Sequence, residues 1–141
     1  MLTTGYLFTG PAAVRYPRGA GPGTLLPDGL EPIPIGKGVT KREGSGVAIL
    51  AFGSMVAPSL SAAESMDATV ADMRFVKPLD EDILRKYLSE AQAFVSIEDG
   101  SVAGGAGSAV QEFCSDNNIN VKSKLFGIPD IFIEHQSREE M

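Results

Sequence analysis

Short apolar runs alternate with amphipathic helical segments between residues 47 and 126, and this alternation constrains the fold more than any other feature of the sequence. The runs are 47–52, 68–73, 93–97 and 121–126. Strands that alternate with helices of about 10 to 15 residues indicate βαβ units with right-handed crossovers. The sequence therefore predicts an α/β domain with three layers, in which a mainly parallel sheet lies between helices.

A further strand is predicted at residues 35–41. Glu43-Gly44-Ser45-Gly46 then supplies turn residues of the kind that join two antiparallel strands. The unbroken apolar run at 47–52 is typical of a strand that is covered on both faces. We therefore expect one antiparallel edge strand, joined to the 47–52 strand by a hairpin.

Local signals also mark the starts of helices. Pro58 fits the first turn of a helix whose apolar face includes Val56 and Leu60. Asp80 is the expected N-cap of a helix with acidic residues in its first turn. A third helix is expected after the glycine-rich stretch near residue 104.

The first 34 residues show a different pattern. Residues 1–9 indicate the end of a helix, 12–17 a short strand closed by a proline, and 20–34 a linker rich in proline and glycine. These features divide the chain into 1–19, 20–34 and 35–141.

A capping box at Ser137-Arg138-Glu139-Glu140 announces a further helix just before the sequence ends. One turn of helix is not stable alone in water. Together with the incomplete helix at residues 1–9, this leads us to expect that the sequence is a piece of a longer polypeptide.

Charge and cysteine usage exclude several classes of protein. The formal net charge is −6, and the 12 lysines and arginines are dispersed, so no basic footprint for nucleic acid is present. A single cysteine excludes an internal disulfide framework and favours a reducing compartment, for which the cytoplasm is the simplest choice. No apolar run approaches the roughly 20 residues that span a membrane, and we expect no membrane partner.

The glycine-rich loop 100–108 follows a predicted strand and precedes a predicted helix, which is where a phosphate can bind. The third glycine of the dinucleotide fingerprint is missing, however, and Glu98 and Asp99 on the approach would repel a phosphate. We therefore favour close packing and assembly as the role of the loop, with Glu98 and Asp99 in a hydrogen-bonding or helix-dipole role.

Two other reactive side chains have ordinary explanations. His135 is the sole histidine, so we do not expect a Ser-His-Asp triad or a metal site with several histidines within this chain, and an exposed loop position is expected for His135. Cys114 shares an apolar stripe with Val110 and Phe113, so we interpret it as a small buried hydrophobic residue rather than a nucleophile.

Five separated strings carry a resemblance to a known family. They are Arg15-Tyr16-Pro17-Arg18-Gly19, Pro34-Ile35-Gly36-Lys37-Gly38, Asp72-Met73-Arg74-Phe75-Val76-Lys77-Pro78-Leu79-Asp80, Gly104-Gly105-Ala106-Gly107-Ser108 and Gly127-Ile128-Pro129-Asp130. In this order they closely resemble the C-terminal part of the 1-deoxy-D-xylulose-5-phosphate synthases, transketolase-like thiamine-diphosphate enzymes. The resemblance implies that 1–19 is the tail of the pyrimidine-binding domain, 20–34 the interdomain linker, and 35–141 a transketolase C-terminal-like domain that stops at its last helix.

The resemblance also implies a reaction and its cofactors. Members of the family are homodimers that condense pyruvate with D-glyceraldehyde 3-phosphate with loss of CO2, and the product feeds isoprenoid, thiamine and pyridoxal synthesis. They hold thiamine diphosphate through Mg2+ on a Gly-Asp-Gly motif followed by an asparagine, and a glutamate activates the cofactor. This chain has neither feature, since its Asp-Gly pairs are Asp28-Gly29 and Asp99-Gly100. We therefore expect no cofactor, no metal ligand and no catalytic residue in this piece, which alone is inactive.

Arg18 is the one residue to which the resemblance assigns a role. In the family, the second arginine of Arg-Tyr-Pro-Arg-Gly reaches the phosphate of D-glyceraldehyde 3-phosphate, and a guanidinium suits that task because it can bind phosphate oxygens bidentately. Arg15 is expected to support the strand or a domain interface. The implied partners are the remaining domains of the parent enzyme and a second subunit.

Two alternatives stay open. A free-standing α/β module could bind a small anion or a protein partner through the loop 100–108. Another transketolase-like enzyme, such as a dehydrogenase subunit of a keto-acid complex, would share the fold but would not be expected to carry residues 72–80 in this form.

Overall fold

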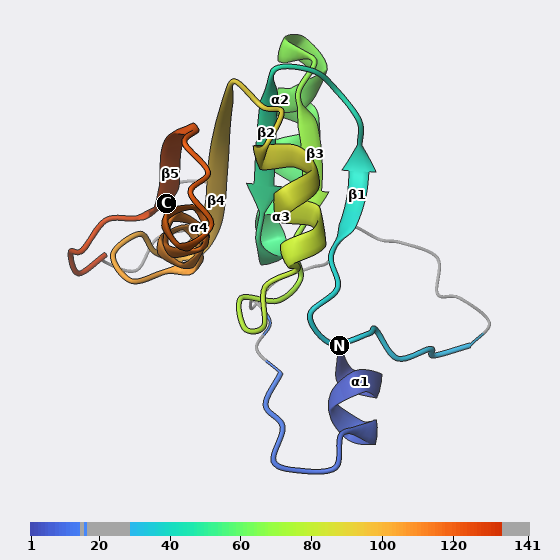
Figure 1. Cartoon of the computed structure of the whole chain (residues 1–141). Helices are drawn as coiled ribbons and strands as arrows, with labels where there is room; N and C mark the ends of the chain where they lie inside the picture. Colours follow the sequence, from blue (N-terminus) through green and yellow to red (C-terminus); the bar gives the residue numbers. More distant parts are fainter. Residues whose placement is uncertain (15, 17–28, 134–141) are drawn as a thin grey trace.

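A five-stranded sheet forms the centre of the molecule (Figure 1). The structure is a computed structural model that describes residues 1–14, 16 and 29–133. The strands lie in the order β1-β3-β2-β4-β5. Their bounds are β1 (Val39–Arg42), β2 (Val47–Ala51), β3 (Thr69–Asp72), β4 (Ala93–Ser101) and β5 (Lys122–Ile128).

The pairing of the strands confirms the predicted fold class. The pairs β2–β3, β2–β4 and β4–β5 are parallel, and only β1–β3 is antiparallel among the described strands. A mainly parallel sheet with one antiparallel edge strand is therefore present. The four residues of β2 after Val47 are buried, as its unbroken apolar run predicted.

The predicted hairpin between the edge strand and the 47–52 strand is wrong. β1 pairs with β3, which lies between β1 and β2, so residues 43–46 cross the amino end of β3 instead of making a tight turn. The Ser45 N–H donates to the Asp67 carbonyl oxygen at 2.7 Å. A side chain on Gly44 would collide with that carbonyl. Residues 43–46 thus allow the chain to pass closely over the end of β3. Distant residues determine which strand pairs with β1, so the turn-like sequence alone does not specify it.

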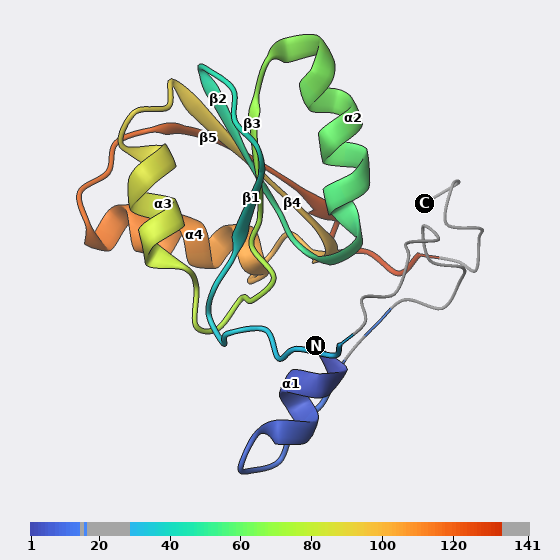
Figure 2. The same cartoon turned by 90° about the vertical axis from the view of Figure 1, so that its right-hand side faces the viewer.

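Helices cover both faces of the sheet, and Figure 2 shows the sheet edge-on between them. After a short 3₁₀ turn, η1 (Gly53–Met55), helix α2 (Val56–Met66) packs on one face. Helices α3 (Glu81–Leu88) and α4 (Ala106–Asp116) lie on the other. Three layers result, with the larger core between the sheet and α3 and α4, around Leu50, Leu84 and Phe94.

The N-terminal segment departs from the prediction. Helix α1 (Leu2–Leu7) is present, but none of its residues is buried. Residues 11–14, at the start of the predicted 12–17 strand, are irregular. A strand needs a neighbour to satisfy its backbone groups, and the described sheet offers none here. Hydrogen bonds between the Thr4 hydroxyl and the backbone of Ile33 tie α1 to the segment that enters the domain.

Two strands have other bounds than predicted. β1 begins at Val39, because Ile35 and Gly36 form a turn in which Gly36 has a φ of +74°. β4 extends through Glu98-Asp99-Gly100 to Ser101, where it regains pairing with Ile128 of β5 after an irregularity. The acidic pair thus lies in the strand rather than in the loop after it. At the far edge, β5 exposes Lys122 and Lys124.

Helix α4 approaches β4 closely through a glycine. A side chain on Gly107 would collide with the Ser96 hydroxyl and would lie 3.0 Å from a Leu125 methyl carbon. Ser96 itself is fully buried, and its hydroxyl oxygen has no hydrogen-bond partner among the described residues. A buried hydroxyl without a partner costs stability.

This packing predicts a coupled pair of substitutions. Ser96→Ala should raise the free energy of unfolding by about 1 kcal/mol, because it removes an unsatisfied hydroxyl. Gly107→Ala should lower it by about 2 kcal/mol through overpacking. The double variant should have a higher free energy of unfolding than the sum of the two single effects gives, since alanine at 96 vacates space beside the new methyl group. Urea unfolding of the four proteins measures this, and strict additivity would contradict it.

Candidate functional site

The predicted loop 100–108 lies at the carboxyl ends of parallel strands, where ligands usually bind in open α/β sheets. Its predicted bounds are too wide, since residues 100 and 101 belong to β4 and 106–108 to α4, and the connection itself is 102–105. It leads from β4 into α4, with Gly104 in the left-handed region at a φ of +70° and Gly105 extended. The Val102 N–H donates to the Ile128 carbonyl oxygen at 3.0 Å, which holds the loop against the end of β5. The predicted position of the loop is therefore confirmed.

The carboxylate of Glu98 occupies the anion-binding position at the start of α4. Its two oxygens accept hydrogen bonds from the Ala106 and Gly107 N–H groups, each at 3.0 Å. A side chain on Gly105 would lie 2.5 Å from one of these oxygens and would collide with the Ser101 carbonyl oxygen. Glycine at 105 is thus needed for close packing, and Glu98 has the hydrogen-bonding role expected of it.

Asp99 points away from Glu98. The Ser54 hydroxyl, in η1, donates to an Asp99 carboxylate oxygen at 3.1 Å, whereas Glu98 binds α4 on the opposite face of the sheet. Consecutive residues of a strand face opposite sides. The two carboxylates therefore do not form a paired acid–base site, and a phosphate at this loop would have to displace Glu98.

Cys114 is confirmed as a buried hydrophobic residue. Its side chain lies in the core between α4 and the sheet, and burial raises the pKa of the thiol. A raised pKa leaves the nucleophilic thiolate scarce near neutral pH. Arg18, Arg15, His135 and the capping box at 137–140 all lie outside the described residues, so their predicted roles stay predictions.

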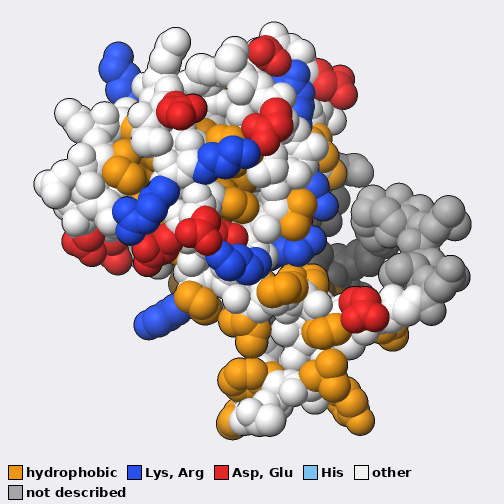
Figure 3. All heavy atoms as spheres, turned by 45° about the vertical axis from the view of Figure 1, so that its right-hand side comes forward, with side chains coloured by type: hydrophobic (Ala, Val, Ile, Leu, Met, Phe, Trp, Pro, Cys, Tyr) orange, Lys and Arg blue, Asp and Glu red, His pale blue; other side chains and the backbone are white. Residues whose placement is uncertain are grey.

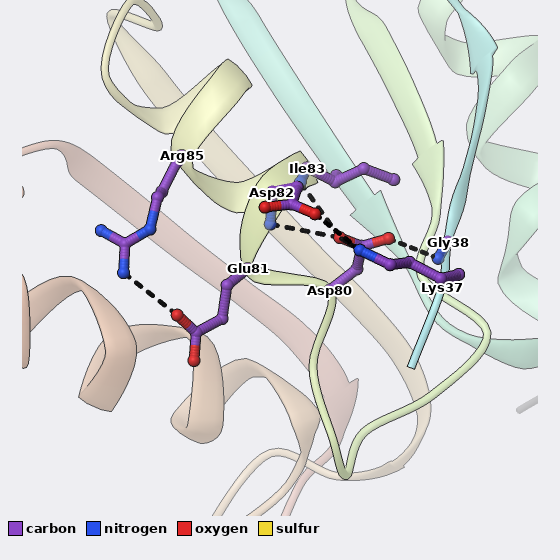
Figure 4. A network of polar contacts seen from close by, with 7 residues as sticks. All are labelled: Lys37, Gly38, Asp80, Glu81, Asp82, Ile83 and Arg85. Atoms are coloured by element: carbon purple, nitrogen blue, oxygen red, sulfur yellow. Dashed lines mark hydrogen bonds and ion pairs between the residues drawn. The ribbon is translucent and has the colours of Figure 1, made fainter. Parts of the chain in front are cut away.

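A second cluster joins the start of the domain to α3 through Asp80 (Figure 4). The Asp80 carboxylate accepts from the Asp82 and Ile83 N–H groups, which confirms it as the N-cap of α3. It also accepts from the Gly38 N–H at 2.9 Å, although it is only 4% exposed. The sequence predicted the helix cap but not the long-range hydrogen bond from Gly38 to Asp80. Glycine at position 38 was the one sequence feature that could have indicated a close approach of the backbone there.

Lys37 completes this cluster at the surface. Its ammonium nitrogen lies 2.6 Å from Asp82 and 3.6 Å from Asp80. The hydrogen bond to Asp82 raises the pKa of Lys37, and the same bond lowers the pKa of Asp82. The cluster holds charges in fixed pairs, which favours a structural role over proton transfer.

A pocket of about 340 Å³ opens at the opposite edge of the sheet, at the amino ends of β2 and β3. On its wall, the Tyr87 hydroxyl lies 2.8 Å from both Glu43 and Lys86. The hydrogen bond from Lys86, followed by that from Tyr87, lowers the pKa of Glu43. Sequence reasoning did not anticipate this network, since Glu43 is 43 or more positions from its two partners.

Arg74 was also missed as an individual residue. It follows the carboxyl end of β3 in the left-handed region, with a φ of +58°. Its Nε lies 3.7 Å from an Asp72 carboxylate oxygen, and its side chain is 25% exposed. Lys41 approaches the same oxygen at 3.9 Å.

Neither a metal centre nor a membrane span is found in what the structure describes. Residues 1–14, 16 and 29–133 contain no group of three or more His, Cys, Asp or Glu placed to hold a metal ion. Within the same ranges, no helix has the length and apolar character needed to cross a bilayer.

Comparison with protein families and curated proteins gives consistent matches. The family described as "Transketolase, C-terminal domain" matches residues 36–141. The 1-deoxy-D-xylulose-5-phosphate synthases of Pseudomonas paraeruginosa and Nitrosococcus oceani are each 52% identical to the chain over 141 residues, and that of Pseudomonas savastanoi pv. phaseolicola is 54% identical over 142. All of this chain is aligned, but it spans only 22% of the length of each relative.

A solved structure has the same fold. It is described as "Split gene transketolase, inactive beta4 tetramer" and superposes with a TM-score of 0.74 at 34% sequence identity. The match covers 83% of this chain and 40% of that one.

The geometry around Glu98 predicts a helix-capping effect. Glu98→Ala should lower the free energy of unfolding by about 1 to 2 kcal/mol, because two N–H groups of α4 lose their acceptor and the helix dipole loses a favourable charge. Glu112→Ala is the matched control, since Glu112 is exposed on the same helix. Urea unfolding should show a change within about 0.5 kcal/mol for the control, and equal effects of the two substitutions would contradict the capping role.

Proposed function

The chain belongs to the transketolase C-terminal domain family, and from that premise we propose that it is the C-terminal region of a 1-deoxy-D-xylulose-5-phosphate synthase. The observation that carries the proposal is the 52% identity to such synthases across all 141 residues. The complete enzyme would condense pyruvate with D-glyceraldehyde 3-phosphate with loss of CO2. In this proposal, residues 1–19 end the pyrimidine-binding domain, 20–34 link the domains, and 35–141 form the C-terminal domain.

The proposed role of this region is structural, with one contact to substrate. The sequence has no Gly-Asp-Gly motif, and the described residues offer no cluster for Mg2+. The residues present therefore do not fit thiamine diphosphate with its metal, and the remainder of the enzyme would supply that site. Arg18 is proposed to bind the phosphate of D-glyceraldehyde 3-phosphate through its planar guanidinium.

The geometry at the carboxyl edge of the sheet supports a structural role for this region, with the cofactor site in the remainder of the enzyme. At the carboxyl edge of the sheet, Glu98 already fills the start of α4, and Asp80 fills the start of α3. An anionic substrate would meet negative charge at both positions. The same contacts weigh against a free-standing module that binds anions through the loop 100–108.

The proposal further holds that the chain alone is inactive and acts with other chains or domains. The split-gene transketolase of similar fold is described as an inactive tetramer, which supports this view by analogy. The complete enzyme is proposed to act as a homodimer. A cytoplasmic location is proposed because this chain has a single cysteine, which favours a reducing compartment.

Calorimetry tests the absence of a cofactor site. Titration of the chain with thiamine diphosphate in the presence of Mg2+ should give no binding heat, because the chain lacks the diphosphate-binding motif. Binding in the micromolar range would contradict the proposed division of the site.

A fusion tests the function itself. The parts of the Pseudomonas paraeruginosa synthase that flank its match to this chain would be joined to the corresponding ends of the chain, and the fusion should form 1-deoxy-D-xylulose 5-phosphate. Arg18→Ala should raise the KM for D-glyceraldehyde 3-phosphate about 10- to 100-fold, because a charged hydrogen-bonding partner of the phosphate is lost, and should leave the KM for pyruvate unchanged.

Two controls accompany this measurement. Arg18→Lys keeps the positive charge but lacks the bidentate guanidinium, so its KM for D-glyceraldehyde 3-phosphate should lie between those of the wild type and of Arg18→Ala. Arg85→Ala removes an exposed arginine that pairs with Glu81 and should change neither KM. An active fusion in which Arg18→Ala behaves as wild type would refute the assignment of Arg18, and an inactive wild-type fusion would refute the proposed function.

A further inference from the structure

Arg74 has hydrogen-bonding capacity that the described chain does not use. Its side chain is three-quarters buried, yet the contact of Nε with Asp72 at 3.7 Å is too long for a hydrogen bond, and no other described residue accepts from it. An arginine carries five N–H donors, and those of Arg74 remain in contact with water, because among the described residues the Ser96 hydroxyl is the one buried side-chain group without a partner. They are therefore open to a partner from outside the described chain. The left-handed backbone at a φ of +58° adds strain, and strained residues persist where the structure makes use of them.

The charges around Arg74 limit the kind of anionic group that its guanidinium can bind. Asp72 lies between Arg74 and Lys41, so these three groups carry a net charge of +1. Lys37, on the adjoining segment, is already paired with Asp80 and Asp82. A single carboxylate would balance this charge, whereas a phosphate dianion would leave an excess. The forked geometry of a guanidinium also matches a carboxylate.

The same end of the domain carries a large exposed apolar surface, here called the apolar foot. Figure 3 shows orange side chains gathered over and beside α1. Its described members are Met1, Leu2, Tyr6, Leu7, Phe8, Leu30, Ile35 and Val76, each between 45% and 88% exposed. The first 14 residues contain no charged side chain. Such a surface marks an interaction site, and its lack of charge is typical of an obligate one.

Arg74 and the apolar foot are parts of one surface. Val76 belongs to the loop that follows Arg74, and Ile35 precedes Gly36, which packs against Pro78 of that loop so closely that a side chain there would lie 2.7 Å from the proline ring. The hydrogen bonds between Thr4 and Ile33 then join α1 to this assembly. Figures 1 and 2 place α1 and the β3–α3 loop at the same end of the sheet.

We propose that Arg74 is the polar anchor of an interface formed by the apolar foot, and that its guanidinium binds an aspartate or glutamate of the polypeptide carrying the cofactor-binding domains. This inference rests on the proposed function, since the chain spans only 22% of the length of its relatives. The partner surface is apolar with one carboxylate facing Arg74. Burial of that pair fixes the register between the two surfaces, because an unpaired charge in an apolar interface is strongly disfavoured.

The test compares the free chain with the fusion to the Pseudomonas paraeruginosa synthase. Arg74→Gln should leave the Tm of the free chain within about 1 °C, because no hydrogen bond is lost there. In the fusion it should lower the Tm by about 5 °C, because a buried carboxylate loses its partner. Arg74→Lys should give an intermediate loss in the fusion. Arg85→Gln removes an arginine whose partners, Glu81 and the ring of Phe113, both lie within this domain, so it should change the Tm of the free chain and of the fusion by equal amounts.

Each outcome decides the inference without using enzymatic activity. Equal losses in the free chain and the fusion would show that Arg74 acts only within its own domain, through Asp72, and would overturn the proposal. No loss in the fusion would overturn it as well, as would a wild-type fusion in which this domain is no more stable than the free chain. Activity of the wild-type fusion reports separately on the proposed function, so an active fusion that is indifferent to Arg74→Gln refutes the anchor alone.

Discussion

The organisation of the domain depends on the hydrogen bonds that the buried carboxylate of Asp80 accepts. Three backbone N–H groups, from Gly38, Asp82 and Ile83, converge on it. One side chain therefore starts α3 and fixes the point at which the chain enters β1. A carboxylate this far from water is stable only where hydrogen bonds and a nearby cation replace its hydration, and Lys37 supplies that cation.

The domain uses the same device twice at one edge of its sheet. Asp80 fills the N-terminal position of α3, and Glu98 fills that of α4 from the preceding strand. These are the positions at which many α/β proteins bind phosphates. Because the chain's own carboxylates occupy these positions, they stabilise this edge of the sheet and also leave no helix N-terminus free for a phosphate at α3 and α4.

Local patterns were sufficient to predict the layers, the parallel core strands and the Asp80 cap, because each depends on residues within one or two helical turns. The partner of β1 was predicted wrongly, since turn-like residues 43–46 are compatible with both a hairpin and a crossing over β3. Glu98 and Asp99 resembled a strand end, although β4 pairs with β5 again at Ser101. The Tyr87 network joins residues 43 or more positions apart, which no local pattern encodes. Arg18 was assigned only by resemblance.

The exposed lysines of β5 bear on how copies of this domain can meet. An edge strand offers unpaired backbone groups to any other strand, and lysines on such a strand discourage that pairing because their ammonium groups would be brought together and dehydrated. Lys122 and Lys124 stand on the outermost strand, and Lys124 also lies over the ring of Phe126. The β5 edge of the sheet is thereby protected against pairing with a strand of another molecule, and at this edge contacts between molecules are directed to faces and loops, where shape and charge can discriminate among partners.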